Sequence, residues 1–214
     1  MPQQQAPTEL PSVPEPYLQA IKLIDEAHAQ DPNLIDGPEG PKTLPYELHY
    51  AREMSRWLAL HSPDATEALQ VACRAQHFRR WELPRSSFPM TRPGYLLWRS
   101  KQKSQAATQV SSLIAPLFPS PSDPAIARIA ALIRKENLTS DPEAQALEDV
   151  ACLVFLDDQF DEFEGRPEID EEKVVGILRR TWGKMGERGK ELALGMDLSE
   201  RAKTLIGKAL EPTP

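Results

Sequence analysis

The segment from 144 to 156 constrains the fold of this chain more than any other. Its apolar residues fall on nearly every side of a helix rather than along one stripe, and a helix of that kind is normally buried. These residues are Ala144, Leu147, Val150, Ala151, Val154, Phe155 and Leu156. We therefore expect this helix at the centre of the fold.

Amphipathic segments lie on both sides of it. Apolar residues recur at helical spacing within 15–30, 45–60, 62–77, 93–117, 124–136, 170–186 and 198–210. Glycine and proline cluster between Asn33 and Thr43, which predicts a loop, and no run alternates long enough to indicate a strand. The prediction is an all-α fold with a single compact helical domain over 15–211, preceded by a flexible Pro/Gln-rich tail over 1–14.

Composition limits the class of protein. Cys73 and Cys152 each lie inside an apolar helical run, which is typical of buried thiols in a reducing compartment. No apolar run approaches the ~20 residues that span a bilayer, and the N-terminus lacks the regions of a secretory signal. We expect a cytoplasmic protein with no membrane partner.

Positive charge is concentrated in one stretch of an otherwise acidic chain. The net charge is −7, yet the stretch from 74 to 103 carries +7 because eight basic residues face a single acid, Glu82. The basic residues are Arg74, Arg79, Arg80, Arg85, Arg92, Arg99, Lys101 and Lys103. Such segregation favours an anion-binding site.

The side chains in this stretch suit that role. Guanidinium groups bind phosphate or carboxylate through two parallel hydrogen bonds, and aromatic rings can stack on a base or sugar. The candidate anion-binding residues are Arg79, Arg80, Arg85, Arg92 and Arg99, with Trp81, Tyr95 and Trp98. One alternative stays open: the acidic stretch 157–172, with a charge of −8, could pair with these arginines and make both structural.

Four further candidates, His49, His77, Glu136 and Asp149, fall on separate apolar helices. The segments around them are LHYAREMSRWL, ACRAQHF, IARIAALIRKEN and ALEDVACLVFLDD. Their order and setting resemble the HD-domain superfamily of metal-dependent phosphohydrolases. The resemblance implies an HD-like bundle in which these residues hold a divalent transition metal that activates water.

The chain departs from that superfamily at two positions. Phe78 stands where the family has an aspartate directly after the histidine, and Glu136 stands where some members have a histidine. Glutamate can ligate a metal and phenylalanine cannot, so the ligand set would be completed by Glu47, Glu136, Glu148 or Asp149. Glu148 and Asp149 could instead form buried salt bridges to Arg79 or Arg80. His28 and His61, near helix ends, are expected at the surface.

A closer resemblance covers most of the chain. It rests on PYELHYAREMSRWL, ARAQHFRRWELPRSSFPMTRPGYLLWR, LIRKENL, ALEDVACLVFL and LRRTWGKM. These segments resemble an uncharacterised family of fungal and bacterial proteins, some of them labelled glutamyl-tRNA synthetase. The label finds no support, because the chain lacks the two signature motifs of a class I synthetase. This resemblance implies no activity.

Two functional hypotheses follow. The first is an enzyme, a metal-dependent hydrolase of a phosphorylated small molecule or nucleotide. The second is a non-catalytic helical module that binds an anionic partner, a nucleotide or RNA, through the arginine and aromatic residues. Phe78 favours the module, and the acids within the most apolar helix favour the enzyme.

Overall fold

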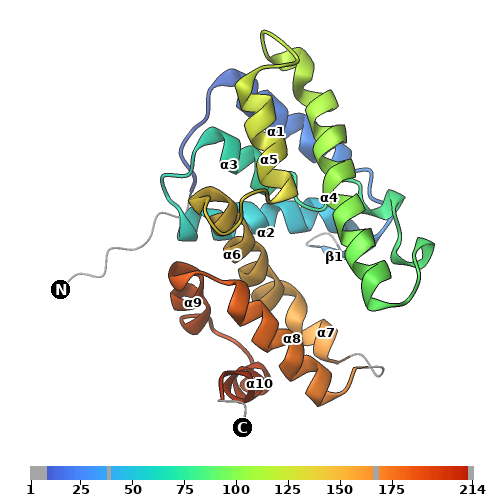
Figure 1. The fold of residues 1–214 in the computed structure, drawn as a ribbon, viewed down its shortest axis with the longest axis vertical. Coiled ribbons are helices and arrows are strands. Elements are labelled where there is room, and N and C mark those ends of the chain that lie inside the picture. Colours follow the sequence, from blue (N-terminus) through green and yellow to red (C-terminus); the bar gives the residue numbers. More distant parts are fainter. Residues whose placement is uncertain (1–8, 38–39, 166–168, 212–214) are drawn as a thin grey trace, which may run out of the picture. The chain divides into compact units, whose positions relative to one another are not determined.

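The computed structural model describes residues 9–37, 40–165 and 169–211. These residues form ten α-helices and two short strands, which confirms the all-α prediction (Figure 1). The chain separates into two compact units, Met1–Leu147 and Glu148–Pro214, and helix α6 (Pro142–Val154) runs across the division. The single domain over 15–211 stays a prediction, and residues 1–8 of the expected tail lie outside the described residues.

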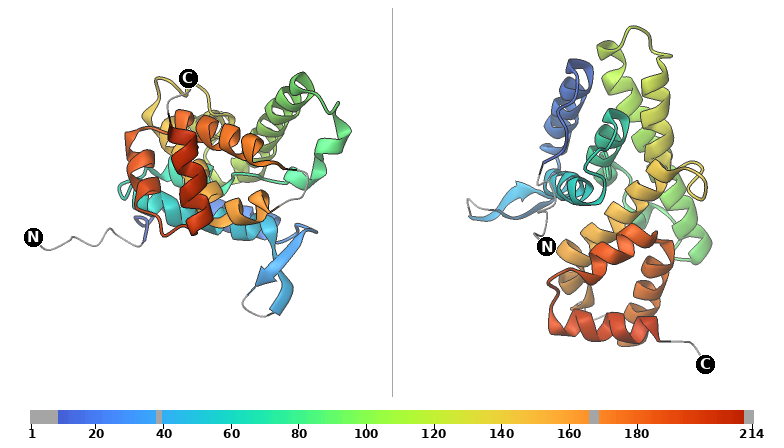
Figure 2. Two further views of the ribbon diagram at one scale, coloured as in Figure 1. Left: turned by 90° about the horizontal axis from the view of Figure 1, so that it is seen from below. Right: turned by 90° about the vertical axis from the view of Figure 1, so that its left-hand side faces the viewer.

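The first unit is a bundle of helices with short 3₁₀ turns between them. Its helices are α1 (Glu15–His28), α2 (Tyr46–His61), α3 (Glu67–Arg74), α4 (Arg92–Ile114) and α5 (Pro124–Arg134). Its 3₁₀ turns are η1 (Arg80–Glu82), η2 (Arg85–Ser87) and η3 (Ala115–Leu117). Helix α5 packs along α4 and α3, and α1 packs on α2 and α3 (Figures 1 and 2). Their apolar stripes meet in a core that includes Ile24, Met54, Leu58, Ile114 and Ile129.

The expected loop between Asn33 and Thr43 is a β-hairpin instead. Strand β1 (Leu34–Gly37) pairs antiparallel with β2 (Gly40–Pro45), and the hairpin projects from the first unit in Figure 2. Only three apolar residues, Leu34, Ile35 and Leu44, lie in these strands, too few to show an alternation in the sequence.

Helix α3 is shorter than predicted at both ends. Thr66 caps its start instead of a residue near 62, because the Thr66 hydroxyl accepts the N–H of Leu69. The helix ends at Arg74 and not at His77. The backbone of His77 has a φ of +64°, in a left-handed region that cannot continue an α-helix.

The second unit holds the remaining elements. A π-helical segment, η4 (Phe155–Gln159), continues α6 into α7 (Phe160–Glu164), followed by α8 (Glu171–Lys184), α9 (Glu187–Leu194) and α10 (Glu200–Leu210). Helix α10 packs on α8. Helix α9 was not predicted, because its eight residues alternate charge with few apolar positions. The burial expected for the apolar segment is confirmed at Leu147, Val150 and Val154, each 0% exposed.

The described helices are each too short or too polar to span a bilayer.

Candidate functional site

A buried histidine–glutamate pair lies beneath the arginine stretch. His28, at the end of α1, is 0% exposed and Glu47, in the first turn of α2, is 3% exposed. His28 Nδ1 lies 3.1 Å from Glu47 Oε2, and His28 Nε2 lies 3.0 Å from the Arg74 carbonyl oxygen. A carbonyl only accepts, so Nε2 carries a hydrogen. The contact at Nδ1 then requires a second proton, which the imidazole and the carboxyl group share.

Glu47 also fixes the backbone that follows α3. Its Oε2 accepts the N–H of Arg79 at 2.9 Å, and its Oε1 accepts the N–H of Arg80 at 2.6 Å. Two successive N–H groups that converge on one anion form a backbone nest. Both His77 and Arg79 have positive φ, which costs about 1–3 kcal/mol for each such residue. The carboxylate therefore stabilises a turn that the chain would not adopt alone.

Burial raises the pKa of Glu47 above its ordinary value. Desolvation is the largest cause, and the hydrogen bonds from His28 and from the Arg80 backbone oppose it. Asp31 accepts the backbone N–H of Glu47 at 3.0 Å and, as a nearby acid, also favours the protonated carboxyl group. The raised pKa of Glu47 therefore agrees with a proton held at the contact between Glu47 and His28.

The turn places the Arg80 guanidinium in a setting without acids. Its Nη1 donates to His77 Nε2 at 2.9 Å, and the guanidinium carbon Cζ lies 4.9 Å from the centre of the Trp98 ring. With the Gln102 amide turned so that its oxygen faces Arg80, the Arg80 Nε donates to it at 3.1 Å. Among the described residues, no carboxylate lies within 4.0 Å of this guanidinium. Burial and then the charge of Arg99 lower the pKa of Arg80.

His77 is held as a neutral hydrogen-bond donor. Its ring stacks on Tyr50 with centroids 3.9 Å apart and planes 9° apart. Burial, Arg80, Arg99 and Lys135 hold the pKa of His77 well below its usual value. Since Nε2 accepts from Arg80, the ring hydrogen is on Nδ1, a buried atom to which the described residues give no partner. Its Nδ1–H is therefore a buried donor that the described residues leave without an acceptor.

The other arginines of the stretch differ in their partners. Arg74 is bidentate to Asp25, with both N···O distances 2.6 Å. Arg85 donates to backbone carbonyls, Phe88 at 3.0 Å and Pro89 at 2.8 Å, and so fastens the turn before α4. These two arginines are structural.

Arg79 lies 3.7 Å from Glu82 and close to the ring of Phe78. Arg92 is exposed, whereas Arg99 is half-buried and acts electrostatically on both His77 and Arg80. Within the predicted set, Arg80 and Arg99 are thus the two whose charges act on the same imidazole.

The aromatic candidates are spread along α4 and the turn before it. Trp98 is buried, donates its indole N–H to the Leu83 carbonyl at 2.8 Å, and lies 5.8 Å from the Tyr95 ring. Tyr95 is 46% exposed and Trp81 is half-buried. Trp98 therefore supports Arg80, while Tyr95 and Trp81 are accessible to a ligand.

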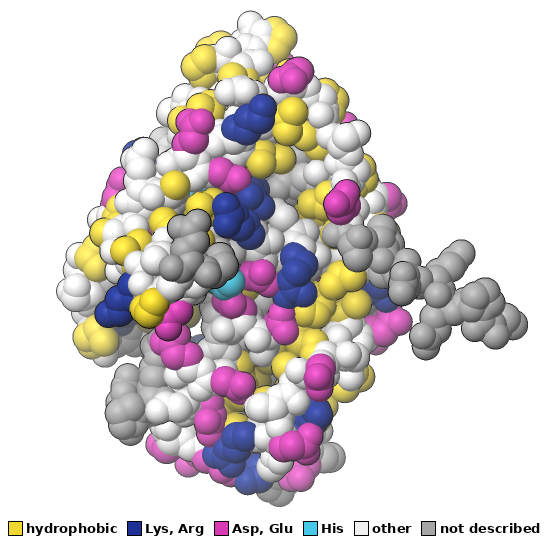
Figure 3. Space-filling view, turned by 180° about the vertical axis from the view of Figure 1, so that it is seen from behind, with side chains coloured by type: hydrophobic (Ala, Val, Ile, Leu, Met, Phe, Trp, Pro, Cys, Tyr) yellow, Lys and Arg dark blue, Asp and Glu magenta, His cyan; other side chains and the backbone are white. Residues whose placement is uncertain are grey.

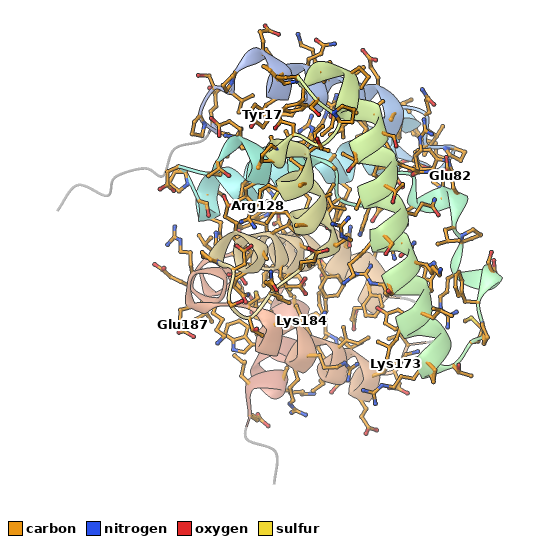
Figure 4. The ribbon with its side chains drawn as sticks, turned by 45° about the horizontal axis from the view of Figure 1, so that its top comes forward. Tyr17, Glu82, Arg128, Lys173, Lys184 and Glu187 are labelled. Carbon is orange, nitrogen blue, oxygen red and sulfur yellow. The ribbon has the colours of Figure 1, made fainter. Side chains whose placement is uncertain are left out.

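A hollow of about 400 Å³ lies between this turn and α4. It is lined by Leu83, Phe88, Lys101, Ser104, Gln105, Thr108 and Gln109. Glu82, labelled in Figure 4, accepts from Gln105 at 3.4 Å and from Gln109 at 2.7 Å. These bonds orient the Gln109 amide and leave its oxygen buried, with no partner among the described residues. On α4, its lining begins at Lys101, one turn after Trp98. Its volume is large enough for a small molecule.

The candidate metal ligands do not gather in the described residues, where no three His, Cys, Asp or Glu side chains are placed to hold a metal ion. His49 is half-buried on α2. His77 directs its Nε2 lone pair at a guanidinium, and Glu136 is exposed and accepts from Arg134 Nε at 2.5 Å. As they lie, both side chains are hydrogen-bonded to arginines rather than placed to bind a metal ion. The metal set stays a prediction, since Asp149 belongs to the other unit.

The acids of α6 have partners in the second unit. Asp149, 1% exposed, accepts the N–H of Gly186 at 2.8 Å, just before α9. It also packs so closely on Gly189 that a Cβ there would lie 2.7 Å from its Cγ. Glu148 lies 3.5 Å from Lys184 Nζ. These contacts give both acids a structural role.

The acidic stretch pairs with α10. Glu164 accepts from Arg201 at 2.8 Å, and Glu171 lies 3.0 Å from Arg201 and also pairs with Lys208. In Figure 3, Lys and Arg side chains of the second unit lie among Asp and Glu side chains. Part of the acidic charge is therefore balanced within its own unit.

Sequence analysis missed the central pair. His28 was expected at the surface but is fully buried, and Glu47 was considered only as a spare ligand. The signal was available in the helical register. His28 lies four residues after the buried Ile24, and Glu47 lies four before the buried Ala51. What the register cannot show is that these two positions, on different helices, face one another.

Comparison with known proteins gives a family and no activity. No curated protein and no solved structure matches the chain. Residues 18–206 match a family described as a domain of unknown function, DUF4202. That match includes every residue of the His28–Glu47 pair and of the Arg80 turn, and the chain therefore belongs to the DUF4202 family.

Proposed function

We propose that the first unit is a non-catalytic module that binds a phosphate-bearing partner, a small molecule, nucleotide or RNA, at Arg80. The observation that carries this proposal is a half-buried guanidinium with no carboxylate within 4.0 Å among the described residues. A buried charge is costly unless an opposite charge compensates it. A bound anion supplies that charge.

The neighbouring groups fit a phosphate in particular. Arg99 adds a second positive charge that acts on Arg80. A phosphate group has three or more oxygens and can accept from all of them, whereas a carboxylate has two. The accessible rings of Trp81 and Tyr95 suit a base or sugar.

Calorimetric titration with inorganic phosphate, adenosine monophosphate and a short single-stranded RNA tests the proposal. Arg80→Ala should lose about 10-fold or more in affinity, the range expected for a charge-assisted hydrogen bond. Arg80→Lys should also bind more weakly, because an ammonium lacks the two-point geometry. Arg201→Ala, which removes an exposed arginine of the second unit that already has acidic partners, is the matched control.

Moderate salt should reduce the affinity for every phosphate ligand, since charges are screened beyond ~8 Å at physiological ionic strength. Equal affinity in wild type and Arg80→Ala, or no binding of any of the three probes, would refute the proposal. The three probes also separate a small-molecule site from an RNA-binding one.

The metal-dependent hydrolase rests on the HD resemblance alone. Its test is elemental analysis of purified protein for a divalent transition metal, with His77→Ala as the comparison. A bound metal that His77→Ala removes would favour the hydrolase over the binding module. We also propose a cytoplasmic location, with which two buried cysteines that form no disulfide agree.

A further inference from the structure

Exposed apolar side chains concentrate at the start of α4. Among the described residues, eight large apolar side chains are exposed, and half of them lie between 90 and 97. They are Met90 at 80%, Tyr95 at 46%, Leu96 at 56% and Leu97 at 51%. We call residues 89–97 the apolar tip. Apolar side chains that cluster at the surface usually mark a place of interaction.

The apolar tip is a built structure. Arg85 fastens it by donating to the carbonyls of Phe88 and Pro89, and the Thr91 hydroxyl caps α4 by accepting the N–H of Gly94. The chain folds so tightly that a Cβ on Gly94 would lie 2.2 Å from the Pro89 oxygen. These contacts fix the turn, so its apolar side chains are exposed to solvent in a defined arrangement.

The directions of the side chains indicate what covers them. Successive residues of an α-helix are about 100° apart, so Tyr95, Leu96 and Leu97 point to different sides of α4. Met90 lies in the turn beyond the helix end. A partner protein would cover one side of such a tip, whereas the interface of a bilayer surrounds an inserted tip on all sides.

The charge around the apolar tip favours an anionic bilayer. Between Glu82 and Asp123 the sequence has no acidic residue, and Arg92, Arg99, Lys101 and Lys103 lie on α4. Basic side chains close to a bilayer are attracted to anionic headgroups. Arginine and lysine can keep their charge in water while their stems lie along apolar surface, and tyrosine suits the boundary between the two.

We infer that the apolar tip inserts into the headgroup region of an anionic lipid bilayer and makes this a peripheral membrane-binding protein. This goes beyond phosphate binding at Arg80. It also revises the expectation of no membrane partner, which rested on the lack of a spanning segment. A peripheral contact needs only a small apolar surface and basic residues.

Co-sedimentation with vesicles tests the inference. Wild type is compared on phosphatidylcholine vesicles and on vesicles with about 20% phosphatidylserine, the anionic lipid that attracts basic segments. We expect binding to the anionic vesicles, at least ~5-fold weaker for the double variant Leu96→Ser, Leu97→Ser, since insertion depends on buried apolar area. Leu194→Ser, at a position 68% exposed in the second unit, is the control and should bind like wild type.

A second variant reports insertion directly. In Tyr95→Trp the new indole should shift its emission to the blue with anionic vesicles and not with phosphatidylcholine alone. No binding of wild type to anionic vesicles, equal binding of the double variant, or no shift in Tyr95→Trp would overturn the inference. So would wild-type dimers in analytical ultracentrifugation that the double variant abolishes, because a second copy would then cover the tip.

Arg80→Ala separates the two proposals. If it loses inorganic phosphate but keeps vesicle binding, the phosphate site and the apolar tip act independently, as expected here. If wild type binds vesicles but not inorganic phosphate, the proposed function fails and the membrane inference stands.

Discussion

The two strongly charged regions of this molecule have different partners. In the second unit, the acids Glu164 and Glu171 pair with Arg201 and Lys208 on α10. In the first unit, the Arg80 guanidinium has a histidine, a tryptophan and an amide around it, and the described residues place no carboxylate within 4.0 Å of its nitrogens. A run of charged residues that forms ion pairs within its own unit has a structural role. One that leaves a half-buried charge without them is a candidate for ligand binding.

The difference arises from how each charge is held. The acids of the second unit lie on exposed helices, where solvent screens them and any pair contributes little. Arg80 is held in place by its own backbone, because Glu47 binds the N–H groups of Arg79 and Arg80 from within the core. The chain uses a buried carboxylate to stabilise the turn and leaves the guanidinium free to meet an external anion.

The largest expected effect is the loss of Glu47. Glu47→Ala leaves His28 and two backbone N–H groups without their buried acceptor, so it should destabilise the protein by about 3–5 kcal/mol. Denaturant unfolding measures this. Glu53→Ala, on the same helix and paired with Arg56 across one turn, should cost under about 0.5 kcal/mol. Similar losses in the two variants would remove the distinction between the buried carboxylate and a surface one.

The next effect tests how closely Asp149 packs against Gly189 in the second unit. Gly189→Ala would place a Cβ 2.7 Å from Asp149 Cγ and 2.8 Å from its Oδ2, and overpacking of this kind costs about 1–3 kcal/mol. Gly207→Ala, in α10 with open space around it, should instead stabilise by about 0.5–1 kcal/mol. If Gly189→Ala were also stabilising, Asp149 would not be held where the structure has it.

A smaller effect is the dependence of stability on pH. Folding raises the pKa of Glu47, so protonation of this group contributes to the free energy of unfolding. That contribution is complete below the ordinary pKa of 4.5 and is lost as pH rises through the raised pKa. Glu47→Gln cannot titrate, so its stability should fall less over that interval. Denaturant unfolding at a series of pH values measures both slopes, and parallel slopes would contradict a shared proton.

The pKa of Asp141, in the same unit, is shifted in the opposite direction, so its effect on stability has the opposite dependence on pH. Its hydrogen bond with Arg128, labelled in Figure 4, lowers the pKa of Asp141 to about 2. The stability that this bond contributes is present above the ordinary value of 3.8 and is lost as pH falls toward 2. Asp141→Asn should therefore flatten the acid side of the profile and leave the Glu47 interval unchanged.

The smallest effect is expected from the ion pairs on α10. Arg201→Ala removes the contacts to Glu164 and Glu171, which lie at the surface and are screened by solvent. The melting temperature should change little, and less still in high salt. A loss comparable to that of Glu47→Ala would mean that the acidic stretch is as much a part of the core as the buried pair.

These contrasts also show how far the sequence could predict the structure. Helices α1, α2, α4, α5, α8 and α10 were predictable, because their apolar residues repeat with the period of a helix. The turn at His77 was not, since its left-handed backbone depends on a carboxylate 30 residues earlier in the chain. The arginine stretch was found from charge alone, but charge could not separate Arg74 and Arg85, which are structural, from Arg80.

The most direct test of the central claim is an NMR titration of the arginine Nε–Hε signals with inorganic phosphate. The account predicts that the signals of Arg80 and Arg99 shift together and saturably, while those of Arg74, bound to Asp25, and Arg201, bound to Glu164, stay in place. A uniform small shift of all arginine signals, or a shift of Arg201 without Arg80, would contradict it.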